Sequence, residues 1–308
     1  MSIEILAIFM GAAIRLSAPL LIAATGELVS QKTGVINTSV DGMMLSGAFL
    51  GIYGAYLTNS PMLGFLIAII GILPLALLQA FLSVSLKANQ LVTGIGINIL
   101  ALGLTTLIYR KVFFENNDGN VKTSFGFNKL QIFSPEQFPN LANIFNQSWI
   151  VYFGLVLLFI VYFMMKKTSL GISVNAVGEE PKTVDQSGLS VTALRYFGVF
   201  VSSIMASIAG CLISLGDIHT FTEGMTSGIG FLALAAIIFG NWNIIKTALA
   251  CFLFGIVSAL QYQLPAMGIN VPPALLIMLP YVLALFAVAG LMGKQTAPKA
   301  LTVPFIGH

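Results

Sequence analysis

The residues of this sequence that could do chemistry are polar side chains set in otherwise apolar stretches. They form two clusters, one of Asn37, Ser39 and Asp41, and one of Phe221, Glu223 and Thr226. Amide, hydroxyl, carboxylate and aromatic groups together suit a neutral solute that forms hydrogen bonds, such as a nucleoside or a sugar. The competing interpretation of each residue is the capping of a helix break. Asn98, in a long apolar stretch, could serve the same pathway or form an interhelical hydrogen bond.

The sequence shows no catalytic or metal-binding pattern. It has only two histidines, His219 and His308, and its two cysteines, Cys211 and Cys251, both fall in apolar segments. It contains no glycine-rich phosphate-binding loop motif. We therefore predict that the chain is not an enzyme, has no metal site and binds no cofactor itself.

The composition shows which kind of element must position these residues. Of 308 residues, 57% are hydrophobic and only 8% are charged, against about 25% charged in an average soluble domain. The mean hydropathy is +0.94. The chain is therefore predicted to be an integral membrane protein. Its net charge of +3 is spread between apolar segments, which argues against nucleic-acid binding.

Because a membrane crossing needs roughly 20 helical residues, apolar segments locate the helices. The candidate segments are 3–25, 36–57, 61–84, 91–110, 149–165, 195–216, 229–240, 244–262 and 273–291. The segment 229–240 is too short to cross as one helix, and 36–57 carries Asn37 and Asp41 near its start. We expect a single transmembrane domain over residues 1–308: an all-α polytopic bundle of about 8–10 segments, with one or two broken or re-entrant helices.

The polar stretch 166–195 interrupts the apolar pattern. Pro181 suits the first position of a helix, Glu179 and Glu180 suit its positive end, and Gly188 suits a left-handed C-terminal cap. The result is a helix over about 181–187 that is too short to be stable without a partner surface. More Lys and Arg fall on the cytoplasmic side if 166–195 is cytoplasmic and the polar loop 111–148 is extracytoplasmic.

Three further features have two interpretations each. Gly26-Glu27 before Asp41-Gly42-Met43 resembles Gly216-Asp217 before Glu223-Gly224-Met225, which fits either an internal repeat or chance. Arg15 in the first segment is either a pathway residue or the partner of a carboxylate such as Asp41 or Glu27. Gly47-x-x-x-Gly51 and Gly224-x-x-x-Gly228 are typical of close helix packing.

Three stretches resemble a known family, the permease subunits of bacterial ABC importers of the branched-chain amino acid/ribose type, and within it the nucleoside-uptake branch. They are Gly26-Glu27-Leu28 through Asn37 to Asp41-Gly42-Met43, Asn175 to Pro181 through Ser187-Gly188, and Phe221-Thr222-Glu223-Gly224-Met225 through Gly230 to Trp242. The branch usually has Glu at position 41. Many relatives have Arg where this chain has Ile229, and Pro where it has Ile244. These differences concern the identity of the substrate more than the class of the protein.

The resemblance implies a type II importer-like fold in the bacterial cytoplasmic (inner) membrane, working by alternating access. It implies a second permease, identical or a paralogue, an ATP-binding subunit that holds ATP and Mg, and an extracytoplasmic solute-binding protein or lipoprotein. The short helix would be the coupling helix on the ATPase. The residues that it assigns to this coupling are Ala176, Val177, Gly178, Glu179, Glu180, Pro181, Lys182, Asp185 and Gly188.

Other functions remain open at this point. A simple sugar such as ribose or galactose is the alternative substrate within the ABC class. An ion-coupled secondary transporter would use Asp41, Asp217 and Glu223 as ion sites, but it has no need of a capped helix in its central cytoplasmic loop. A membrane enzyme or assembly factor is disfavoured because no constellation of His, Cys or carboxylates is present.

Overall fold

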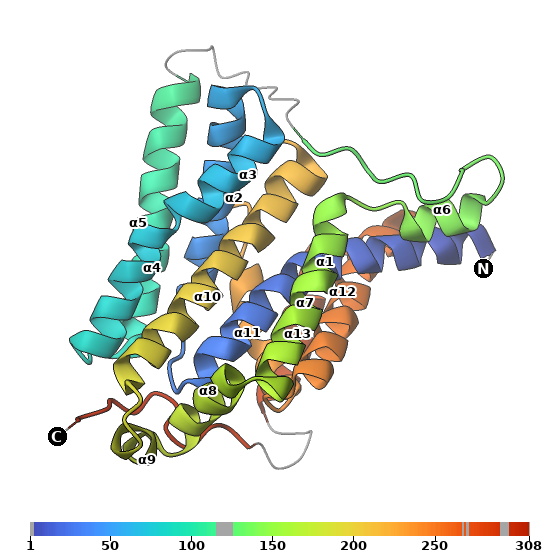
Figure 1. The fold of residues 1–308 in the computed structure, drawn as a ribbon. Coiled ribbons are helices and arrows are strands. Elements are labelled where there is room, and N and C mark those ends of the chain that lie inside the picture. Colours follow the sequence, from blue (N-terminus) through green and yellow to red (C-terminus); the bar gives the residue numbers. More distant parts are fainter. Residues whose placement is uncertain (1–2, 115–125, 267, 269–270, 290–295, 308) are drawn as a thin grey trace.

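The computed structural model describes residues 3–114, 126–266, 268, 271–289 and 296–307 (Figure 1). Its elements are α1 (Ile3–Lys32), α2 (Val40–Thr58), α3 (Pro61–Gly71), α4 (Leu73–Ala80), the π-helix η1 (Phe81–Ser85), α5 (Gln90–Tyr109), η2 (Arg110–Phe114), α6 (Pro139–Phe145), α7 (Trp149–Lys167), α8 (Ser169–Glu179), α9 (Pro181–Gln186), α10 (Val191–Cys211), η3 (Leu212–Ile218), α11 (Ile229–Phe239), α12 (Ile244–Ala266) and α13 (Pro273–Val288).

The helices confirm a polytopic all-α membrane protein. Within the described residues, seven helical stretches are long and apolar enough to cross a bilayer, and two shorter apolar helices, Ile229–Phe239 and Ala274–Phe286, accompany them. The first helix continues past the expected residue 25 to Lys32, which places Glu27 inside it. Helices α3, α4 and η1 together form one span, Pro61–Ser85.

Helices α1, α2 and α10 form the centre of the bundle, and small residues let them approach closely. A Cβ atom on Gly47 of α2 would lie 2.4 Å from the carbonyl oxygen of Ser207 in α10, and one on Gly51 would lie 3.0 Å from the Cys211 sulfur. The predicted packing role of the Gly47–Gly51 pair is thus confirmed. Gly224 and Gly228 instead have φ values of +66° and +85° in a non-helical segment, so their predicted packing role is wrong.

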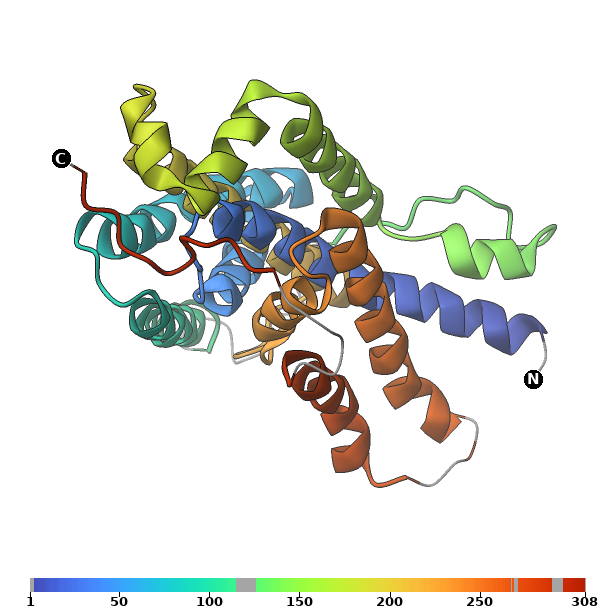
Figure 2. The same cartoon turned by 90° about the horizontal axis from the view of Figure 1, so that it is seen from below.

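The polar segments lie at opposite ends of the bundle. Helices α8 and α9 and the C-terminal residues occupy one end, and α6 with the segment that precedes it extends from the other (Figures 1 and 2). This arrangement fits the predicted separation of 166–195 from 111–148, although residues 115–125 of that loop lie outside the described residues. The first described residues of α1 lie beside α6, so the N-terminus belongs to the end opposite α9.

The polar stretch 166–195 holds two short helices where one was expected. The predicted helix is present as Pro181–Gln186, with Pro181 in its first turn, and it is preceded by Ser169–Glu179. Gly188 has a φ of +85°, as a left-handed helix end requires. The local sequence signals therefore placed this helix correctly.

Candidate functional site

The first helix break, residues 33–39, turns back alongside α1. The backbone N–H of Asn37 donates a hydrogen bond to Glu27 Oε1 at 3.0 Å, and Glu27 lies more than one turn before the end of α1 at Lys32. The segment therefore returns into the bundle without helical structure, and α2 begins only at Val40. Such a backbone is tolerated at membrane depth when protein surrounds it.

Glu27 is the buried centre that holds this break. Its Oε1 also accepts from Gln31 Nε2 at 3.0 Å, and its Oε2 accepts from Ser202 Oγ at 2.7 Å. Asn37 Nδ2 donates to the same Ser202 hydroxyl at 3.0 Å, and Asn37 Oδ1 accepts from the N–H of Ser39 at 3.1 Å. All of these side chains are buried. The structure thus gives Asn37 and Ser39 structural partners, and neither lines the cavity described below.

Asn98 of α5 closes the same break from the other side. Its Nδ2 donates to the carbonyl of Thr38 at 2.9 Å, and its Oδ1 accepts from the N–H of Gly42 at 2.7 Å. A Cβ on Gly94, one turn away, would lie 1.9 Å from the Thr38 hydroxyl. Asn98 therefore binds free backbone groups at the start of α2, which fits the interhelical alternative.

The second break, residues 219–228, meets the first at Asp41. Asp41 Oδ2 accepts from Thr226 Oγ1 at 3.2 Å, and its Oδ1 accepts from the N–H of Gly230 in the first turn of α11 at 3.0 Å. Asp41 itself lies in the first turn of α2. The N-termini of two helices, both carrying partial positive charge, thus share one carboxylate. Two of the predicted pathway residues, Asp41 and Thr226, are brought together here.

The other two members of the second cluster lie apart from Asp41. Glu223 forms a bidentate ion pair with Arg110, with Nε–Oε1 and Nη2–Oε2 distances of 2.7 and 2.9 Å. The hydrogen bond from Arg110 lowers the pKa of the Glu223 carboxyl below its ordinary value. Phe221 is buried, with its ring 5.2 Å from those of Phe49 and Tyr109. It is a core residue rather than an aromatic wall of a cavity.

Sequence reasoning missed two residues beside these breaks, Arg110 and Tyr281. The hydroxyl of Tyr281 donates to the carbonyl of Ser227 at 2.5 Å. Tyr281 lies mid-way along the apolar helix α13 and is 40% exposed, and Ser227, Arg110 and Glu223 are exposed as well. A lone tyrosine hydroxyl within the apolar segment 273–291 was the available signal. Together these four residues form what we call the polar face.

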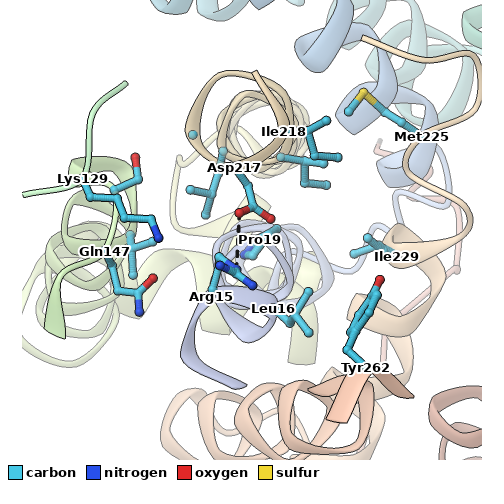
Figure 3. Close-up of a pocket in the computed structure, with 15 residues that line it drawn as sticks. Arg15, Leu16, Pro19, Lys129, Gln147, Asp217, Ile218, Met225, Ile229 and Tyr262 are labelled. Atoms are coloured by element: carbon cyan, nitrogen blue, oxygen red, sulfur yellow. Dashed lines mark ion pairs between the residues drawn. The ribbon is translucent and has the colours of Figure 1, made fainter. Parts of the chain in front are cut away.

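A cavity of about 170 Å³ opens between α1, η3, α12 and the start of α7 (Figure 3). Arg15 and Asp217 lie within it, with Arg15 Nε 3.3 Å from Asp217 Oδ1. The predicted partners Asp41 and Glu27 were therefore wrong, because the outer end of α10–η3 lies nearer to this part of α1. Ser148 lines the same cavity with a buried hydroxyl that has no hydrogen-bond partner within the described chain. None of the seven predicted pathway residues lines this cavity.

The residues assigned to ATPase coupling lie on and around α8 and α9. Val177, Val184 and Val191 form a small apolar core beneath α9. Glu179, Glu180, Lys182, Asp185 and Gly188 are exposed, whereas Gly178 is buried and a Cβ on it would lie 2.2 Å from the carbonyl oxygen of Lys32. Helix α8 is therefore anchored to α1, α9 is held on α8 and α10 through the apolar core, and both helices expose charged residues. Among the described residues, no three His, Cys, Asp or Glu side chains are grouped to hold a metal.

Comparisons with known proteins agree over nearly the whole chain. Residues 9–288 match the family model described as branched-chain amino acid transport system / permease component. The chain is 32% identical to the guanosine ABC transporter permease protein NupQ of Bacillus subtilis, over 99% of this chain and 98% of that protein. It is 30% identical to the nucleoside ABC transporter permease protein NupC of Lactococcus lactis, over 94% of each. It is 32% identical to the putative glucose ABC transporter permease protein TsgC13 of Haloferax volcanii, over 86% of this chain and 80% of that protein.

Proposed function

We propose, since the chain belongs to the family of branched-chain amino acid transport system permease components, that it is the permease subunit of an ABC importer for nucleosides. It is a multi-pass protein of the cytoplasmic membrane. The observation that carries the nucleoside assignment is the similarity over nearly full length to proteins named as guanosine and nucleoside permeases. Energy enters through a separate ATP-binding subunit that holds ATP and Mg, and this chain hydrolyses nothing.

The polar face supports a pathway that is shared with a second permease. Tyr281, Ser227 and the Arg110–Glu223 pair are exposed beside the half-buried Asp41. Exposed charged and polar side chains on a membrane protein are costly against lipid and favour a protein or aqueous surface. We therefore place the second permease, identical or a paralogue, against this face, with the solute passing between the two subunits. A solute-binding protein would deliver the solute to the end that carries α6.

In this proposal the two helix breaks are the segments that change conformation during transport. Non-helical segments can change their backbone angles without breaking a helical ladder, so 33–39 and 219–228 are the natural hinges of the bundle. The carbonyl of Ser39 in the first break accepts from the N–H of Met43 in α2, and Thr226 in the second break donates to Asp41. In this proposal the α8–α9 face docks on the ATP-binding subunit, and closure of that subunit re-orients the two breaks and alternates access.

The test is uptake by the complete importer reconstituted in proteoliposomes, with its ATP-binding and solute-binding subunits. ATP-dependent accumulation of radiolabelled guanosine or adenosine is expected, and it should vanish when the ATP-binding subunit carries an inactive catalytic site. Uptake that is independent of ATP but is abolished by an ionophore would overturn the ABC assignment in favour of an ion-coupled transporter.

A sugar is the second candidate solute, because of the similarity to a permease named for glucose. The same proteoliposomes discriminate between the two. Competition by unlabelled nucleosides with little effect of glucose, ribose or galactose is expected. The reverse pattern would keep the importer class and replace the substrate.

A further inference from the structure

The C-terminal residues 296–307 form a tail that crosses the end of the bundle carrying α8 and α9 (red in Figures 1 and 2). The tail lies on the protein and is not a free end. Pro298 and Ala300 are buried, and the side chain of Leu301 packs against the main core. A terminal segment is ordered in this way only when specific contacts hold it, so its contacts are informative.

The tail contacts, one after another, elements that are far apart in the sequence. Asn241 Oδ1, in the turn after α11, accepts from the N–H of Thr296 at 2.7 Å. The N–H of Ala300 donates to the carbonyl of Gly178 in α8 at 2.8 Å. The N–H of Thr302 then donates to the carbonyl of Gly34, at the base of the first helix break, at 3.0 Å.

Its last contacts are with α10 and α9. The carbonyl of Val303 accepts from Arg195 Nη1 at 3.0 Å. Phe305 packs against the apolar core that Val177, Val184 and Val191 form beneath α9. Through these residues the tail joins α8, α9 and α10 directly to the first helix break.

Two glycines show how closely the tail fits. Gly34 has a φ of +89°, and a Cβ on it would lie 2.9 Å from the carbonyl oxygen of Ala300 and 3.1 Å from Arg195 Nη2. A Cβ on Gly178 would lie 3.3 Å from the Cβ of Pro298. The backbone of Gly34 therefore lies against that of Ala300, and the backbone of Gly178 lies against the Pro298 ring, so a displacement of one segment should move the other.

A buried arginine, Arg195, also binds the tail through a charged hydrogen bond. This side chain is only 2% exposed, and the Val303 carbonyl accepts its one hydrogen bond within the described chain. A buried guanidinium without an acceptor is strongly unfavourable. Arg195 is thus a positioning residue that fixes the tail between α10 and the break.

We propose that this tail is a strap that transmits the displacement of α8 and α9 to the first helix break, and so couples the ATP-binding subunit to the pathway. The inference rests on the proposed function, since it presumes that α9 docks on an ATPase. Gly34 lies at the cytoplasmic base of the break, and Asp41 lies just past its other end. A displacement of Phe305 together with α9 would therefore be transmitted through the tail to Gly34, and from there to the segment that leads to Asp41.

The first test measures solute uptake and ATP hydrolysis by the complete importer with Phe305→Ala. The substitution removes the ring that anchors the tail on α9, whereas Ile306→Ala truncates a neighbour that is 73% exposed and serves as the control. Uptake per ATP hydrolysed is expected to fall severalfold in Phe305→Ala and to stay at the wild-type value in Ile306→Ala. An unchanged ratio in Phe305→Ala, in a complex that assembles normally, would overturn the strap.

The second test asks whether the tail stays on α9 throughout the cycle. A disulfide between Val184→Cys and Phe305→Cys ties the two together, and the native Cys211 and Cys251 are fully buried and do not compete. Because Phe305→Cys also removes the anchoring ring, the reduced sample should be impaired as Phe305→Ala is. A strap that moves with α9 should regain uptake when the disulfide ties the tail back to α9. If oxidation instead stops the remaining uptake and a reductant restores it, the tail must leave α9 during transport and the strap is wrong.

The two proposals fail in different ways. If the wild-type importer accumulates no solute on ATP, the proposed function fails whatever the tail does. If the wild type works and only the Phe305 or disulfide results disagree, the importer assignment stands and the strap alone is rejected.

Discussion

At the scale of single residues, the carboxylates of this chain have distinct physical tasks. Asp41 joins the first turns of α2 and α11, Glu27 fastens the first break inside the bundle, and Glu223 pairs with Arg110 on the exposed face. Carboxylates in a membrane protein are costly unless they are paired or serve a pathway. Here each has named donors: Glu27 is fully buried, both oxygens of Glu223 are bound by Arg110, and Asp41 is half-buried where the two breaks meet. Asp41 is therefore the strongest candidate for a group that senses the solute.

Replacing Asp41 with Ala should impair both stability and uptake. The change leaves the N–H of Gly230 and the hydroxyl of Thr226 without their acceptor, at a cost of about 1–3 kcal/mol. Asp41→Asn keeps one oxygen for Gly230 and should cost less. Thermal unfolding in detergent and uptake in proteoliposomes measure the two effects. Equal stability of the Ala and wild-type proteins would contradict the capping role.

Replacing Glu27 should be among the more destabilising single changes. Glu27→Ala removes the acceptor of Asn37, Gln31 and Ser202 in a fully buried setting, and each unpaired group costs about 1–3 kcal/mol. Glu27→Gln keeps one acceptor oxygen and should be milder. The midpoint of thermal unfolding is the measurement, with the exposed Glu4→Ala as control. A Glu27→Ala protein as stable as the control would show that the network is dispensable.

The Arg110–Glu223 pair should persist at all physiological pH values. Because the folded-state pKa of Glu223 is lowered by Arg110, the pair contributes above the ordinary value of 4.5 and is lost as pH falls through the lower folded value. Between pH 6 and 8, uptake by wild type and by Glu223→Gln should therefore differ by a constant factor. A ratio that changed with pH in this window would mean that another group titrates with the pair.

At the scale of elements, the helix pair α8–α9 combines a firm anchor with an exposed charged face. Pro181 starts α9, Gly188 ends its turn, and Val184 holds it to the bundle. A helix this short has no stability of its own. Its position therefore depends on what packs against it, which is the property that a coupling element needs.

Reversing the charge of α9 should separate ATP hydrolysis from transport. Glu180→Lys with Asp185→Lys changes the exposed face and leaves the buried Val184 untouched, so folding should be unaffected. We expect reduced uptake with continued ATP hydrolysis. Glu136→Lys, an exposed acidic residue at the opposite end, is the control. Wild-type uptake in the double variant would remove α9 from the coupling path.

At the scale of the whole molecule, α5 is the most peripheral of the long helices. Only 22% of the residues in its apolar 18-residue stretch are buried. Among the described residues, no atom lies within 4 Å of a Cβ placed on Gly96 or Gly103. A groove lined by Gly103 and Thr106 runs along it to the Arg110–Glu223 pair. Small residues on an exposed membrane helix favour close helix–helix packing, which suits a second permease at this face.

A bulky residue on α5 should therefore interfere with pairing of the permeases. Gly103→Trp has free space among the described residues and so should fold, but it would collide with a subunit docked along α5. Co-purification of differently tagged permeases is expected to fall for Gly103→Trp. Ile160→Trp on the exposed face of α7 is the matched control. Pairing that survives Gly103→Trp would move the interface elsewhere.

What could be predicted from the sequence is what short stretches of chain decide. The apolar segments, the two helix breaks and the capped helix at Pro181 follow from composition, glycine, proline and isolated polar residues, because these act within a few neighbouring residues. The membrane class followed from the same local patterns, whereas the family was indicated by the resemblance of three stretches to known permease subunits. The predicted pathway role of the two polar clusters remains a prediction.

Only the tertiary structure decided which distant groups meet. Arg15 pairs with Asp217 rather than Asp41 or Glu27, Asn37 is locked by Glu27 and Ser202, and Phe221 enters an aromatic core. The places of Tyr281 and the C-terminal tail were likewise not apparent. The physical reason is that partner choice depends on how whole helices pack, and packing is set by contacts summed over the bundle. A residue's own neighbours in the chain therefore say that it needs a partner, but not which one.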